Sequence, residues 1–99
     1  MEKSKMIADL LKVLANENRL IIYSVLMEHP MTVGEIAKYL PKITSSALSQ
    51  HLSLLRAHGI LDSEKSGLNV TYFAADYRVK EIIHALNRII EAESVVNDS

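Results

Sequence analysis

The stretch that decides the fold runs from residue 44 to residue 73 and reads TSSALSQHLSLLRAHGILDSEKSGLNVTYF. Thr44 can cap the N-terminus of a helix, and Gly59 suits the left-handed residue that often follows the last turn. From Ile60 the apolar spacing changes to strand alternation, and the Ser-Gly-Leu-Asn run at 66–69 is a turn. This stretch therefore predicts a helix followed by an antiparallel hairpin.

The predicted helix has two chemically different faces. At about 100° per residue, Leu48, Leu52 and Leu55 fall on one narrow arc. The other side carries small hydroxyls and an amide, and no acidic residue occurs between Thr44 and Ile60. Hydroxyls allow close approach to phosphates and bases, glutamine can pair with adenine, and basic side chains can neutralise phosphates. The candidate DNA contacts on this reasoning are Ser45, Ser46, Ser49, Gln50, Ser53, Arg56 and Lys65. The alternative interpretation is a solvated face that happens to be rich in serine.

Two helices are predicted at the ends of the chain. The first spans about 4–15, and its apolar arc is too broad for one core-facing stripe, which suggests contacts on two sides. The last spans about 78–93 and has an apolar side made of Val79, Ile82, Ile83, Leu86, Ile89 and Ile90.

Between the first helix and the serine-rich helix, start and stop signals define two more helices. Asn16 can cap a second helix that is apolar nearly all round and that Pro30 ends. Thr32 and Glu35 fit a capping box that opens a short helix, Val33 to Leu40, which Pro41 stops. The fold predicted is mainly α with a small β-hairpin: a winged helix-turn-helix with five helices and a two-stranded wing.

Length and composition limit the class of protein. Ninety-nine residues fit a single domain, 1–99, whose modest core would gain stability from dimerisation. The chain has no cysteine, which excludes disulfides, thiol redox sensing and thiolate metal sites. The net charge of −1 argues against a globally basic coat but leaves room for local positive charge. No apolar run approaches the roughly 20 residues of a membrane span, and we expect a soluble cytoplasmic protein with no membrane partner.

Three stretches carry a family resemblance: LANENRL at 14–20, SALSQHLSLLR at 46–56 and GLNVTYF at 67–73. Together they resemble the ArsR/SmtB family of bacterial and archaeal repressors, over roughly residues 6–92. The resemblance implies a homodimer that binds an inverted-repeat operator in double-stranded DNA and blocks transcription, with the first and last helices forming the dimer interface. It also implies that Ser45, Ser46, Ser49 and Gln50 contact DNA, together with the wing tip from Lys65 to Asn69.

The sequence says less about the signal that would regulate the protein than about its binding to DNA. Metal-sensing members of the family use cysteines, or Asp, His and Glu on the last helix, and the aligned positions there fall near Tyr77, Val79, Ile90 and Glu93. Only Glu93 of these is a plausible ligand, so we expect no metal site and no cofactor, while a small-molecule effector stays open. His84 shares a polar face with Glu81 and Glu91, which can describe either a zinc or nickel site or ordinary surface pairing at helical spacing.

His51 and the remaining histidines bear on competing functions. On the helical wheel His51 lies beside the leucine arc, which favours a partly buried histidine bonded to a neighbouring element over a DNA reader. The four histidines, at 29, 51, 58 and 84, are scattered and form no nucleophile–base–acid set, so an enzyme is not expected. The alternative to a DNA-binding regulator is a winged-helix protein-interaction module without sequence-specific DNA binding.

Overall fold

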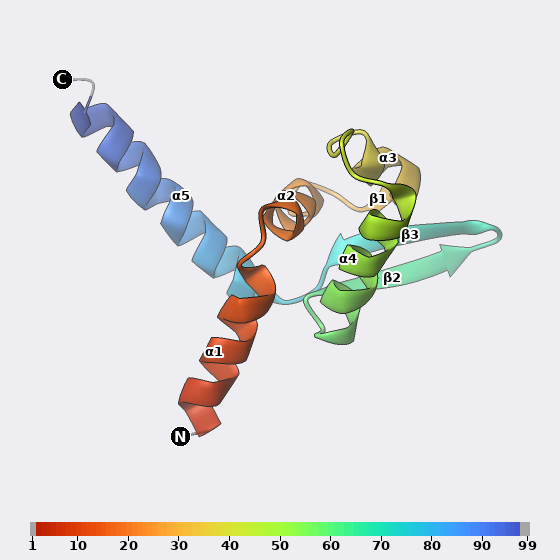
Figure 1. The fold of residues 1–99 in the computed structure, drawn as a ribbon, viewed down its shortest axis with the longest axis horizontal. Coiled ribbons are helices and arrows are strands. Elements are labelled where there is room, and N and C mark those ends of the chain that lie inside the picture. Colours follow the sequence, from red (N-terminus) through yellow and green to blue (C-terminus); the bar gives the residue numbers. More distant parts are fainter. Residues whose placement is uncertain (1, 98–99) are drawn as a thin grey trace.

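A central body of helices and strands carries two terminal helices that extend away from it (Figure 1). The computed structural model describes residues 2–97, and side chains as far as residue 93. In chain order the elements are α1 (Glu2–Leu14), α2 (Glu17–Leu26), β1 (Met31–Thr32), α3 (Val33–Ala37), α4 (Ser45–Ala57), β2 (Leu61–Ser66), β3 (Asn69–Ala74) and α5 (Tyr77–Asn97). The winged helix-turn-helix predicted from the sequence is confirmed.

Three helices begin at the caps that the sequence predicts. The Asn16 side chain accepts a hydrogen bond from the backbone N–H of Arg19 at 3.1 Å, which caps α2. Thr32 accepts from the N–H of Glu35, and the Glu35 carboxylate accepts from the N–H of Thr32, which completes the capping box of α3. Thr44 accepts from the N–H of Ala47 at 3.1 Å and so caps α4. Each cap satisfies a donor that the first turn of a helix leaves without a partner.

The end of α4 is a left-handed stop at Gly59, as predicted. Gly59 has a φ of 70°. Its N–H donates to the carbonyl of Arg56, and the N–H of Ile60 donates to that of Leu55, both at 3.0 Å. This pair of bonds is the Schellman motif, which releases the chain into β2 at a fixed angle.

The predicted ends of two other helices were wrong. The second helix ends at Leu26, four residues before Pro30. α3 ends at Ala37 rather than Leu40. The next three N–H groups, at 38, 39 and 40, donate to the carbonyls three residues earlier, so the turn continues in 3₁₀ geometry. A residue before proline disfavours the helical conformation, so the backbone tightens before Pro41 instead of continuing as an α-helix.

The sheet has three strands, not the two predicted for the wing, in the order β1-β3-β2. β1 is the addition: Met31 lies opposite Tyr72, and Thr32 opposite Thr71, in antiparallel register. Two residues are too few to show strand alternation in a sequence, and Thr32 also serves as the cap of α3. Its partner strand, β3, is far away in the sequence, so no local sequence pattern indicates the pairing.

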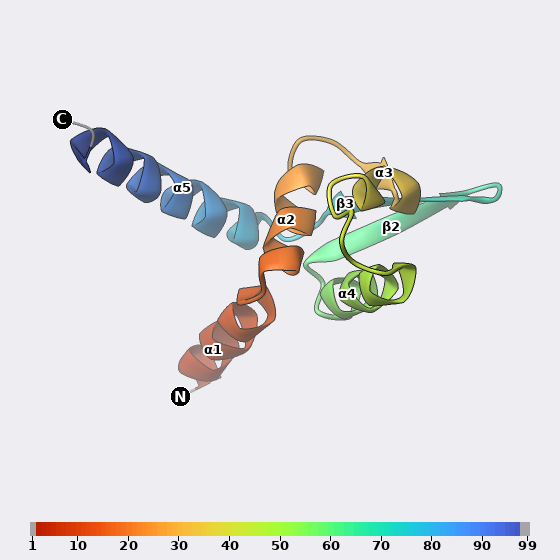
Figure 2. The ribbon, with the colours of Figure 1, turned by 45° about the horizontal axis from the view of Figure 1, so that its top comes forward.

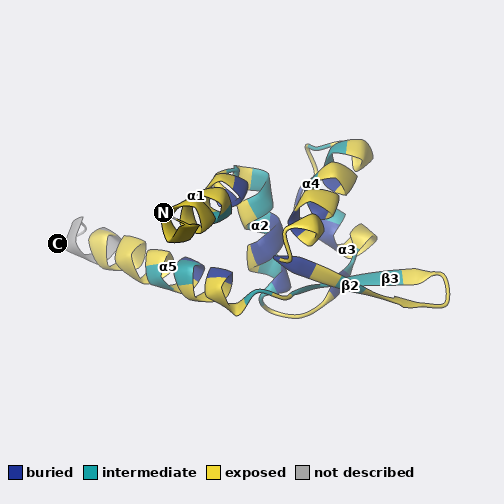
Figure 3. Ribbon diagram, turned by 90° about the horizontal axis from the view of Figure 1, so that it is seen from below, coloured by how far each residue is buried: buried dark blue, intermediate teal, exposed yellow. Residues whose placement is uncertain are grey.

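The core lies where α2, α4 and the base of the sheet meet (Figure 3). The three leucines predicted to face inward from α4, Leu48, Leu52 and Leu55, are at most 2% exposed. Ile22, Tyr23 and Leu26 of α2 pack in the same cluster. Because α4 is fixed by its buried side, its opposite side is presented to solvent in a defined orientation.

Candidate nucleic-acid interface

The outer side of α4 is polar, exposed and free of acids. Five of the predicted contact residues are exposed here: Ser45, Ser46, Ser49, Gln50 and Ser53. The first turn of α4 contains no acidic residue, so nothing in the helix offsets the positive end of its dipole. A helix N-terminus of this kind favours a phosphate, and the small side chains leave room for one.

Sequence reasoning missed Leu54, which is 36% exposed on this same side. It lines a shallow surface with Ser49, Gln50 and Ser53. Its position four residues after Gln50 is the helical spacing that could have revealed it. Leu54 gives the polar face one apolar element of the kind that can contact a thymine methyl group.

The wing is a hairpin that protrudes at the opposite end of the molecule from α5 (Figure 2). Lys65 pairs with Val70, and Ser66 with Asn69, so that only Gly67 and Leu68 form the turn. Gly67 has a φ of 63°, which two-residue hairpin turns require at this position. Lys65 and Asn69 are both exposed near the tip. Leu68 at the tip itself is 99% exposed, a position that the sequence showed only as part of a turn.

Arg56 lies near the last turn of α4, beside the start of the wing. Its Nε is 3.9 Å from Oδ1 of Asp62, and the two side chains are 57% and 60% exposed. An exposed pair at this distance contributes little to stability, so the guanidinium remains available to a phosphate. Asp62 nonetheless reduces the net positive charge at this end of the helix.

His51 is half-buried beside the leucines, as predicted, and contacts a neighbouring helix. Its Nδ1 lies 3.5 Å from Nη1 of Arg19 on α2. Burial, and secondarily the charge of Arg19, lower the pKa of His51 below its ordinary value, because both disfavour the imidazolium form. His51 is therefore a link between helices rather than part of the exposed face.

The terminal helices present apolar side chains that the body does not cover. On α1, Met6, Ile7 and Leu11 are 62%, 51% and 49% exposed. The stripe predicted on the last helix divides: Val79 and Ile83 join the core, whereas Leu86, Ile89 and Ile90 are 50%, 58% and 58% exposed. Helical spacing alone cannot separate the part that packs against its own chain from the part that faces outward.

No metal centre is apparent within residues 2–97. In that region no three His, Asp or Glu side chains gather closely enough to hold an ion, so His84, Glu81 and Glu91 do not form such a group within one chain. Over the same described residues, no helix has the combined length and apolar character of a membrane span.

The geometry defines the class of protein. A short helix, a turn and a second helix with an exposed polar face form a helix-turn-helix, whose second helix enters the major groove of DNA. The protruding hairpin beside it makes the arrangement a winged helix-turn-helix.

Comparison with known proteins gives the family. The sequence model of one protein family, described as bacterial regulatory protein, arsR family, matches residues 16–63. The transcriptional activator HlyU of Vibrio cholerae is 40% identical over 80 residues, which cover 81% of this chain and 73% of HlyU. A solved HlyU structure from V. cholerae N16961 superposes with a TM-score of 0.79 at 40% identity, covering 90% of this chain and 97% of that one. The transcriptional repressor BigR from Xylella fastidiosa superposes with a TM-score of 0.82 at 28% identity, covering 89% of each chain.

The chain belongs to the ArsR family of bacterial regulatory proteins, as its resemblance predicted. It is a DNA-binding transcriptional regulator.

Proposed function

We propose that this protein is a homodimeric repressor that binds an inverted-repeat operator through α4 and the wing. The observation that carries the proposal is the acid-free polar face of α4, held outward by three buried leucines. The residues proposed to contact DNA are Ser45, Ser46, Ser49, Gln50, Ser53, Arg56, Lys65 and Asn69, all of them exposed. A DNA-binding regulator acts where the cell's DNA lies, and we expect that place to be the cytoplasm.

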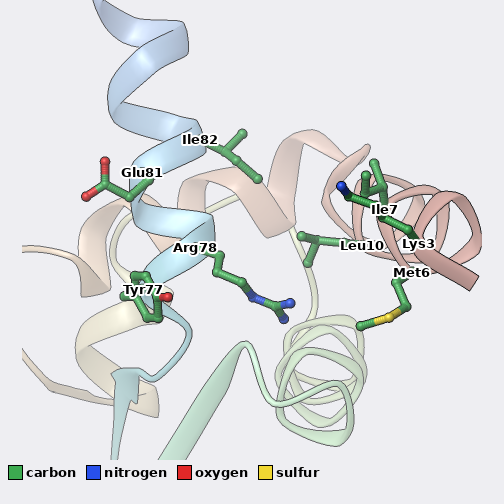
Figure 4. A pocket seen from close by; sticks show the side chains of 8 residues that line it. All are labelled: Lys3, Met6, Ile7, Leu10, Tyr77, Arg78, Glu81 and Ile82. Atoms are coloured by element: carbon green, nitrogen blue, oxygen red, sulfur yellow. The ribbon is translucent and has the colours of Figure 1, made fainter.

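The terminal helices supply the proposed dimer interface. An open groove of about 420 Å³ lies between α1 and α5. In Figure 4, Met6 and Leu10 extend from α1 toward this space, and Ile82 and Arg78 extend toward it from α5. Its lining is mainly apolar, and it adjoins the exposed residues of α5. Apolar patches of this kind on a small domain mark protein contacts, and a second copy of the chain fits the two-sided arc of α1.

A two-fold dimer explains how the protein would select an operator. Two copies of α4 related by the two-fold axis would enter successive major grooves, roughly 34 Å apart, on one face of the DNA. The operator should then be an imperfect inverted repeat with half-sites about one helical turn apart. Base contacts would come from the N-terminal half of α4, and the wing would contact the adjacent backbone.

The sign of regulation is proposed as negative. Among the relatives, HlyU is described as an activator and BigR as a repressor, so the family accommodates both. Repression needs no contact beyond the DNA itself, because a protein that occupies a promoter blocks polymerase. The chain has no cysteine, so any effector must act by other means than thiol chemistry.

The test is protection of the gene's own upstream DNA by the purified protein, with shuffled DNA of equal length as the control. We expect a protected inverted repeat, and an affinity that falls with salt by a logarithmic slope of about 0.9 per phosphate contact. In vitro transcription from the same DNA should decrease. Binding that does not depend on salt or sequence would contradict the proposal and favour a protein-interaction module. Increased transcription from a protected site would reverse only the sign.

A further inference from the structure

Arg19 lies where three helices meet. It belongs to the first turn of α2, and its backbone N–H is held by the Asn16 cap. Its Nε donates to the backbone carbonyl of Val13, near the end of α1, at 2.6 Å. Its Nη1 lies 3.5 Å from Nδ1 of His51, 32 residues further along the chain on α4. One side chain therefore contacts both the terminal helix α1 and the DNA-reading helix α4.

The contact with α1 matters because α1 is loosely attached. Residues 2–9 are all exposed, and only Val13 and Leu14 are buried, at 8% and 5%. The last carbonyls of a helix lack partners within it, and a guanidinium at that end satisfies one and complements the helix dipole. Leu10 is partly buried and also packs against the core. The direction in which α1 leaves the body thus depends on the packing of its last five residues and on the bond from Arg19.

The contact with α4 depends on the form of the imidazole. Nδ1 can accept from the guanidinium only while it carries no proton. Among the described residues, Arg19 on α2 is the charged group that acts on His51. Protonation would remove the acceptor and bring a second positive charge to 3.5 Å from the first.

We propose that Arg19 is a positioning residue, which with His51 as its acceptor sets the angle between α4 and α1. The inference rests on the proposed function, in which α1 lies in the dimer interface and α4 reads the operator. In such a dimer the spacing of the two α4 helices follows from how each is held against its own α1. The planar guanidinium can reach both acceptors at once, and the single ammonium of lysine cannot.

The experiment measures operator affinity for the wild-type dimer and for Arg19→Lys, Arg19→Gln, His51→Ala and the double variant Arg19→Gln/His51→Ala. We expect each single change to weaken specific binding by about tenfold at pH 7.5, in line with the loss of a hydrogen bond to a charged group. The double variant should lose less than the product of the two single losses, because both remove the same contact. Arg88→Gln, which removes an exposed positive charge from α5, is the matched control and should retain the affinity.

A pH profile separates positioning from simple structural damage. The folded protein favours neutral His51, so the contact is complete above pH 6.5 and is lost as the pH falls below that ordinary value. Specific affinity should therefore fall on acidification more steeply for the wild type than for His51→Gln, which keeps an acceptor that cannot take up a proton. Thermal melts and sedimentation at each pH identify any variant that no longer folds or dimerises.

Multiplicative losses in the double variant, or equal pH profiles for wild type and His51→Gln, would overturn the inference. Should Arg19→Gln fail to fold, Arg19→Lys and His51→Ala test the same contact from its two sides. A wild-type protein that binds no operator would instead contradict the proposed function, so the two failures are distinguishable.

Discussion

Arg56 and Gln50 are both exposed on α4, and we propose that they contact different parts of DNA. Gln50 is near the N-terminal half of the helix, where an amide can pair with the edge of adenine. Arg56 is near the last turn, and a delocalised cation there suits a phosphate. Since phosphates carry no sequence information, the two side chains should affect binding in different ways.

Arg56→Gln should weaken binding to operator and to unrelated DNA by similar factors. It should also reduce the logarithmic salt slope by about one, since one phosphate contact is lost.

Gln50→Ala should leave the salt slope unchanged. It should reduce the free-energy difference between the preferred base and other bases, at one position of each half-site, by about 1–3 kcal/mol. Titrations of operator, single-base variants and shuffled DNA at several salt concentrations measure both effects.

Lys80→Gln is the charge-matched control for Arg56→Gln. Lys80 is exposed on α5, a helix that lies on the other side of α2 from α4 (Figure 1). An equal change in salt slope for both variants would mean that net charge, rather than a contact by Arg56, controls binding.

At the residue scale, the sequence predicted on which side of a helix a residue lies, but not which distant residue it contacts. The angular position of His51 was enough to predict that it is half-buried, because helical geometry is local. Its contact with Arg19 joins residues 32 positions apart, and no spacing within either helix specifies it. The exposure of Leu54 and Leu68 was not predicted, because a single apolar residue in an amphipathic helix or a turn forms no distinctive pattern.

At the scale of elements, the start of α5 is fixed by a buried hydroxyl and by an ion pair in which Arg78 is exposed and the Asp76 side chain is mostly covered. Tyr23 of α2 is 1% exposed, and its hydroxyl donates to the backbone carbonyl of Asp76 at 2.8 Å. The Asp76 carboxylate accepts from the N–H and the guanidinium of Arg78, and these bonds lower its pKa. α5 therefore begins at a junction tied to the core through α2.

Tyr23→Phe should destabilise the protein while keeping the aromatic packing. Losing one hydrogen bond costs about 1 kcal/mol. In a domain of this size that corresponds to a decrease in Tm of roughly 4–8 °C. Thermal melts at one fixed protein concentration measure it, since dimerisation makes Tm depend on concentration.

Tyr39→Phe is the matched control, because Tyr39 is 51% exposed and loses only a solvated hydroxyl. Its Tm should stay close to that of the wild type. If both variants shifted Tm equally, the bond from Tyr23 to Asp76 would have no special role in stability.

Elements differ in how far local sequence determines them. The caps at Asn16, Thr32 and Thr44 and the stop at Gly59 involve residues within five positions of one another, so the sequence predicted all of them. β1 could not be predicted, because its hydrogen bonds go to Thr71 and Tyr72 after the chain has folded back. The end of α3 depended on the tight turn before Pro41, where several backbone conformations compete, and α2 ended four residues before Pro30.

At the scale of the whole molecule, the arrangement of α1 and α5 leaves apolar side chains of the single chain uncovered. Its radius of gyration is 15.0 Å, against about 13 Å for a compact domain of 100 residues. The difference reflects the two terminal helices, which extend from the body and are mostly exposed (Figure 3). Several of their exposed side chains are apolar. The wing extends in another direction, so a partner on the terminal helices would leave α4 and the wing uncovered (Figure 2).

Replacing Leu86 and Ile89 together by glutamate should therefore separate the dimer without unfolding the monomer. The two side chains are 50% and 58% exposed in the single chain, so the charges would be solvated there and buried only in the dimer. Sedimentation should show a monomer with unchanged helical circular dichroism. Affinity for the full inverted repeat should fall by about 10²–10⁴-fold, because the second half-site no longer benefits from a linked partner. His84→Glu adds a negative charge to the polar face of the same helix and should remain dimeric. A double variant that stayed dimeric, or a control that dissociated as readily, would place the interface elsewhere on the molecule.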